Sequence, residues 1–174
     1  MDRNATTILL GHGIFYIEDK PIALTRGGGK FTVEREYRSI EADGYPGAIK
    51  GNIVIDSSQA KLEINQLTIV PEDFSNMYPG LVVEKTSDTV KITGDNSIKD
   101  SDYQDEVSWI GKTREGKAVK ITVENAINLE NLDWEMQDKS EVINKLTYNA
   151  TYDLNDETKY EPWSIEWGIQ ESQD

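Results

Sequence analysis

The chain has 174 residues, with 32 acidic against 18 basic side chains, a net charge of −14, a single histidine and no cysteine. This length fits one domain with its own core, and we predict a single domain over residues 1–174, with an N-terminal arm (1–12) and a C-terminal segment (154–174). The acidity argues against a nucleic-acid-binding surface. The lack of cysteine excludes disulfides, thiolate nucleophiles and thiolate metal sites.

The start of the chain predicts neither export nor membrane insertion. Its apolar stretch is too short and the following sequence too acidic for a signal peptide, and no apolar run approaches the length of a membrane span. His12 lies between Gly11 and Gly13, a setting typical of a turn, and one histidine cannot form a histidine pair.

Period-two alternation of apolar and polar residues dominates the sequence and predicts a mainly β protein. In residues 31–38, Phe31, Val33 and Tyr37 are expected on a packed face, and Glu34 and Glu36 on the face toward water. The other expected strands are 14–18, 48–56, 60–70, 89–93, 106–112, 117–128, 131–137, 142–153 and 163–167. Within 60–70 the apolar parity slips near Asn65 and Gln66, which predicts a β-bulge there.

Two hairpins and two helical segments complete the expected elements. One hairpin spans residues 110–119, and a longer one spans 134–152 around a turn at 138–141. A helix is predicted over Pro71–Tyr78, because proline suits its first position, acidic residues follow, and Pro79-Gly80 ends it. A shorter helical turn is expected within 98–104.

The motifs that resemble catalytic or ligand sites do not match the residue patterns that such sites require. Arg26-Gly27-Gly28-Gly29-Lys30 lacks the spacing of a phosphate loop and opens a strand rather than a helix. The acidic residues between 95 and 106 do not fit a calcium loop, and the many carboxylates make chance pairs common. We therefore expect no enzymatic activity, no cofactor and no metal.

The tryptophans at 109, 134, 163 and 167, with eight tyrosines, leave a second interpretation open. They are compatible with a sugar-binding platform on a β-sandwich. They are equally compatible with a core or a subunit interface, where large aromatic side chains are usually found.

The order of these features resembles that of the major tail protein, or tail tube protein, of long-tailed (siphovirus-like) bacteriophages, over about residues 13–168. The segments that carry the resemblance are "TRGGGKFTVEREYRSIEADGYPGAIKG" (25–51), "AKLEINQLTIV" (60–70), "PEDFSNMYPG" (71–80) and the end, 134–168, with "EPWSIEW". None of them is a catalytic signature. The match lies in their order and in how much of the chain they cover.

The resemblance implies a two-sheet antiparallel β-sandwich or barrel with one flanking α-helix. Six copies would close into a ring, and rings would stack into a tube. We then expect an acidic lumen, with Glu34, Glu36 and Glu63 facing it, that repels DNA. Contacts between rings or subunits are expected at two loops, made of Arg26, Gly27, Gly28 and Gly29, and of Asp43, Gly44, Tyr45, Pro46 and Gly47.

The expected partners are other copies of the chain, a tape-measure protein, and distal tail and tail-terminator proteins. DNA would be a cargo that does not adhere, no membrane would be involved, and the protein would reside in the virion after synthesis in the host bacterium. Three alternatives remain: a tube protein of a contractile tail or injection system, a carbohydrate-binding β-sandwich module, and a distal tail or terminator protein that forms rings only.

Overall fold

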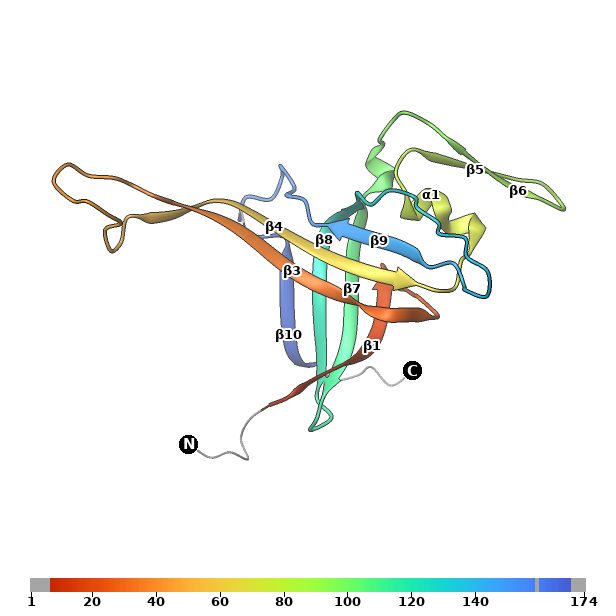
Figure 1. Ribbon diagram of the computed structural model, residues 1–174, viewed down its shortest axis with the longest axis horizontal. Helices are drawn as coiled ribbons and strands as arrows, with labels where there is room; N and C mark the ends of the chain where they lie inside the picture. The colour runs from red at the N-terminus through yellow and green to blue at the C-terminus, as the bar shows by residue number, and fades with distance from the viewer. Residues whose placement is uncertain (1–6, 159, 170–174) are drawn as a thin grey trace.

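The protein is mainly β, with antiparallel strands and one short helix (Figure 1). The computed structural model describes residues 7–158 and 160–169, so the predicted N-terminal arm and C-terminal segment lie partly outside the described residues. The strands are β1 (Leu9–Ile17), β2 (Lys20–Pro21), β3 (Thr25–Ser39), β4 (Ile53–Gln66), β5 (Leu81–Lys85), β6 (Val90–Gly94), β7 (Gln104–Thr113), β8 (Ala118–Asn128), β9 (Asn144–Asn149) and β10 (Trp163–Ile169).

Within residues 7–158 and 160–169, ten strands form two layers and a separate hairpin. Pairing runs β2-β1-β7-β8-β9-β4-β3, with β10 also on β8, and β5 pairs with β6 alone. The β3, β4 and β9 strands cross over the layer of β1, β7, β8 and β10 (Figure 1). Strand β8 joins the layers, because Ile127 and Asn128 at its end pair with β9 while its first half pairs with β10. The coarse prediction of antiparallel layers with a flanking helix is confirmed.

The core lies between the layers. The inner face of β4 contributes alternating side chains that are almost fully buried, Ala60, Leu62 and Ile64, and β9 places Leu146 and Tyr148 beside them. The facing layer contributes aromatic and aliphatic side chains. They are Phe15, Ile17, Val107, Trp109 and Val123. This alternation is the one expected of strands that have one packed face.

The predicted bulge at Asn65 and Gln66 is wrong. Gln66 stays on the inner face and is only 3% exposed, so the inward alternation of β4 continues to its last residue. Residues 48–52 and 67–70, which were expected in strands, lie outside β4. The register irregularities fall elsewhere: between Thr25 and Gly29 on β3, and between Ser57 and Ile55 on β4.

The predicted long hairpin over 134–152, with a strand at 131–137, is also wrong. Residues 129–143 contain no strand, and β9 alone remains of the expected pair. The alternation of apolar and polar residues predicted a strand here, but Leu132 and Met136 are exposed and do not pack against the core. Trp134 instead anchors this segment, with its ring edge-on to Phe74 at a centroid distance of 5.7 Å.

The predicted helix at 71–78 is confirmed as a 3-10 turn (Pro71–Asp73) followed by α1 (Phe74–Met77), and the predicted turn within 98–104 as a 3-10 turn at Asp100–Asp102. Tyr78 fastens α1 to β9, since its hydroxyl lies 2.8 Å from both Asn144 Oδ1 and the Lys145 carbonyl. Burial, with a smaller contribution from the charge of Glu130, raises the pKa of Tyr78 to about 12. The phenol therefore stays protonated and can donate.

Other elements agree with the sequence or were missed. The hairpin predicted at 110–119 is confirmed as the β7–β8 connection. Strand β1 begins five residues earlier than expected, and β5 was not foreseen. Both have mixed sequences without a clean alternation over their full length.

Candidate assembly surfaces

The outer face of β3, β4 and β9 carries the residues predicted to face a lumen. Glu34 and Glu36 are exposed and Glu63 is half-buried, and register places all three on the side away from the core. Basic side chains alternate with them on the same face: Lys30, Arg38, Lys61 and Lys145. This face therefore presents both signs of charge rather than a uniformly acidic surface.

Two of the predicted glutamates on this face have hydrogen-bond partners on the neighbouring strand. Lys61 Nζ lies 2.9 Å from Glu34 Oε2, and this hydrogen bond and charge hold the pKa of Glu34 below its ordinary value. Glu63 is the cross-strand partner of Lys30, and Ser57 donates to Glu36 at 3.0 Å. Glu34 and Glu36 thus each have a polar partner within their own chain, and Glu63 lies opposite Lys30 across the β3–β4 ladder.

The β3–β4 hairpin extends far beyond the two-layer body (Figure 1). Over this part, the side that faces the core elsewhere has no second layer to cover it. Three side chains on it are strongly exposed, and we call them the apolar strip: Tyr37 at 63%, Ile53 at 57% and Ile55 at 50%. Phe31 and Val33 pack against the core as predicted, but Tyr37 does not, because the hairpin has left the body by that point.

The tip of this hairpin contains the second predicted contact loop. Asp43, Gly44, Tyr45, Pro46 and Gly47 are all exposed, and Tyr45 is 68% exposed. Backbone hydrogen bonds shape the tip. They join Ile40 N to Asn52 O at 2.7 Å, Asn52 N to Ile49 O at 3.0 Å and Tyr45 N to Ala42 O at 3.3 Å.

The first predicted contact loop lies at the opposite end of the same hairpin. Gly27 and Gly28 have φ of 80° and 69°, and they form a bulge inside β3 rather than a turn before it. Arg26 is ion-paired with Glu141 of its own chain. The two predicted contact loops are therefore separated by the length of the β3–β4 ladder.

A polar latch ties the C-terminal part of the chain to β3. Arg35 makes two hydrogen bonds to Glu161, at 3.1 and 2.8 Å, and Trp163 Nε1 donates to the same carboxylate at 2.6 Å. The Trp163 ring also packs on Phe31, with centroids 5.7 Å apart. The hydrogen bond from Arg35 is the main cause of a lowered pKa at Glu161. Sequence reasoning missed this latch, because its residues lie 126 positions apart.

The tryptophans do not form an exposed platform. Trp109 is 7% exposed and lies across Gly13 and Gly111, while Trp134 and Trp163 pack on other rings. Only Trp167, at 57%, is strongly exposed among the four. Nothing in this arrangement favours the carbohydrate-binding alternative.

The described residues offer neither a metal site nor a membrane-spanning helix. Within residues 7–158 and 160–169, no cluster of three or more His, Asp or Glu side chains has the geometry to hold a metal ion. No helix in the same residues has the length and apolarity to cross a membrane. Compared with known proteins, the sequence matches no family model and no curated protein sequence.

Proposed function

We propose that the chain is a structural subunit of a phage tail tube, which assembles from identical copies as stacked rings and conducts DNA without binding it. The observation that carries this proposal is the apolar strip of Tyr37, Ile53 and Ile55 on a hairpin that leaves the body. Burying large apolar side chains is favourable, and a strip continuous with a core face is suited to cover by another protein surface.

A free strand edge suggests that the protein surface covering the apolar strip belongs to another copy of the same chain. Strand β3 is the last strand of its layer, and among the described residues it pairs only with β4. An unpaired edge offers backbone donors and acceptors to another chain. If the same edge contact repeats by rotation it closes a ring, and a different contact along the axis stacks the rings.

The outer face of β3, β4 and β9 is suited to line a DNA conduit, although its charges are mixed and not uniformly acidic as expected. Phosphate contact depends on available lysine and arginine side chains. Here Lys61 is held by Glu34, and Arg38 by Asp56 at 2.9 Å. In a lumen lined by this face, these ion pairs would leave fewer lysine and arginine side chains to bind DNA phosphates. The net charge of −14 would add repulsion at longer range.

Electron microscopy of the purified protein over a range of concentrations tests the proposal. We expect hollow tubes, or stacked rings that lengthen as the concentration rises. Rings that never lengthen would favour a distal tail or terminator protein instead. Particles that remain monomers at every concentration and salt condition would contradict self-assembly.

A further inference from the structure

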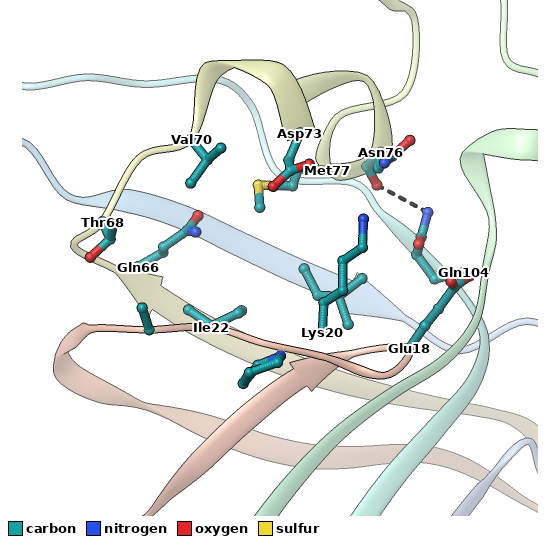
Figure 2. Close-up of a pocket in the computed structure, with 13 residues that line it drawn as sticks. Glu18, Lys20, Ile22, Gln66, Thr68, Val70, Asp73, Asn76, Met77 and Gln104 are labelled. Carbon is teal, nitrogen blue, oxygen red and sulfur yellow. Dashed lines mark hydrogen bonds between the residues drawn. The ribbon is translucent and has the colours of Figure 1, made fainter.

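A small cavity lies at the end of the body away from the hairpin tip, between β2, the loop after β4 and α1 (Figure 2). Its volume is ≈ 120 Å³. The buried side chains of Ile17, Ile22 and Met77 give it apolar walls. An apolar cavity of about 150 Å³ holds a benzene molecule, so this one, which opens to solvent, has room for much of one aromatic ring.

Two buried amides make the cavity chemically selective. Gln66 is 3% exposed and Gln104 is 6% exposed. Gln104 Nε2 donates to the Asn76 carbonyl at 3.0 Å, and Gln66 Oε1 accepts from Asn144 at 3.2 Å. In Figure 2 the Gln66 amide points into the cavity, and no hydrogen bond joins it to the other residues drawn. A buried amide with unused hydrogen-bonding capacity favours an occupant that carries a polar group.

Lys20 adds a positive charge beside the cavity. Its side chain extends from β2 toward Met77 and Asn76 (Figure 2). Glu18 and Asp73 also line the cavity, yet Lys20 forms no ion pair with either of them. The cavity thus combines apolar walls, amide groups and one available ammonium group. An aromatic ring with a hydroxyl, next to a carboxylate, would satisfy all three.

The hairpin tip has this composition. Tyr45 is its one aromatic residue and is 68% exposed, and the acidic residues Glu41 and Asp43 precede it. The tip cannot reach the cavity of its own chain, because the β3–β4 hairpin carries the tip away from the body on the side opposite to the cavity (Figure 1). A projection on one side and a matching cavity on the other are what head-to-tail stacking of identical subunits requires.

We propose that the hairpin tip of one copy, led by the Tyr45 side chain, docks in the cavity between β2, α1 and the end of β4 of a second copy. This inference rests on the proposed function and names the contact that stacks one ring on the next. The phenol ring packs on Ile17, Ile22 and Met77, and its hydroxyl reaches the amide of Gln66. Lys20 then lies close to the carboxylate of Asp43.

Cross-linking provides the test, because the chain contains no cysteine. Gly47 has open space around it and Thr68 lines the cavity, so a Gly47→Cys, Thr68→Cys double variant keeps Tyr45 intact. A short thiol-reactive bifunctional cross-linker should convert it into a ladder of covalent oligomers. The matched control, Gly47→Cys with Ser87→Cys in the β5–β6 turn, should give no ladder. Equal ladders from both would contradict the docking.

A substitution series separates this contact from self-assembly in general. Tyr45→Ala should raise the protein concentration needed for tube formation at least about tenfold, as truncating an aromatic anchor does. Tyr45→Phe should show a smaller increase. If wild type forms tubes while Tyr45→Ala assembles equally well and the cysteine pair does not cross-link, the docking is wrong and the proposed function stands. If wild type forms no assembly at all, both are wrong.

Discussion

The ring of Phe15 lies against the backbone of Gly29, at the place where β3 passes over β1. A Cβ atom built on Gly29 would overlap the Glu63 carbonyl oxygen and sit only 2.6 Å from Phe15 Cζ. Such distances are far shorter than any normal contact. The third glycine of the cluster is therefore required by two close approaches, of the Glu63 carbonyl on the neighbouring strand β4 and of the Phe15 ring from the other layer, whereas the first two are set by their backbone angles.

Gly29→Ala should lower the free energy of unfolding by about 1–3 kcal/mol, because the added methyl group would overlap both the Glu63 carbonyl of β4 and the Phe15 ring. Urea denaturation of the monomeric protein measures this. Gly47→Ala is the matched control, since Gly47 has open space around it, and it should change stability by less than about 0.5 kcal/mol. Equal effects would show that the close approaches of Glu63 and Phe15 to Gly29 do not limit stability.

Tyr78→Phe should cost about 1–2 kcal/mol, because it removes the hydroxyl that bridges α1 to Asn144 and the Lys145 carbonyl. Tyr103→Phe serves as the control, since Tyr103 is 38% exposed. Denaturant titration of both variants distinguishes them. An unchanged midpoint for Tyr78→Phe would mean that the hydroxyl contributes nothing to anchoring the helix.

The latch between Arg35 and Glu161 should make stability dependent on pH in the acidic range. The pKa of Glu161 is lowered in the folded protein, so the stabilisation is present above the ordinary carboxyl pKa of about 4.3 and is lost as the pH falls through the lowered folded value. Glu161→Gln should therefore be less stable than wild type at pH 7, and the difference should shrink below about pH 4.

Thermal unfolding of wild type and Glu161→Gln across this pH range measures the effect. Glu84→Gln, on the exposed part of β5, is the control and should follow wild type throughout. A stability difference for Glu161→Gln that stays constant from pH 7 to pH 3 would show that the carboxylate charge is not what holds the latch.

The fold could be predicted from the sequence where alternation and turn residues agreed. The β7–β8 hairpin and the proline-led helix are examples, because each depends on neighbours in the chain. The structure of the segment 129–143 could not be predicted in this way, because its alternating apolar residues do not pack against the core. Its anchor is the contact of Trp134 with Phe74, two residues that are distant in the sequence.

The surfaces were predictable only in part. The exposed positions of Glu34 and Glu36 follow from strand parity. The interleaved lysines of β4 and β9 could be located only once the strand register was known. The apolar strip depends on how far the hairpin extends beyond the second layer, and the cavity beside Gln66 depends on how β2, the loop after β4 and α1 pack together. No local sequence pattern encodes either arrangement.

Ile53→Ser should suppress assembly without unfolding the subunit, because Ile53 belongs to the apolar strip and contributes nothing to the core. Ile98→Ser is the matched control, since Ile98 is exposed to a similar degree, 62% against 57% for Ile53, but lies off the hairpin. Sedimentation of assembled protein, with circular dichroism to verify folding, compares them. Assembly that is equally impaired or equally preserved in both would remove the strip from the interface.

The central claim is tested most directly by cryo-electron microscopy of tubes formed by the wild-type protein, at a resolution that traces the strands. We expect rings whose bore is lined by the outer face of β3, β4 and β9, with Glu34, Glu36 and Glu63 toward the lumen. We also expect each β3–β4 hairpin to reach the adjacent ring. A bore lined by other strands, with this face on the outer wall, would contradict it.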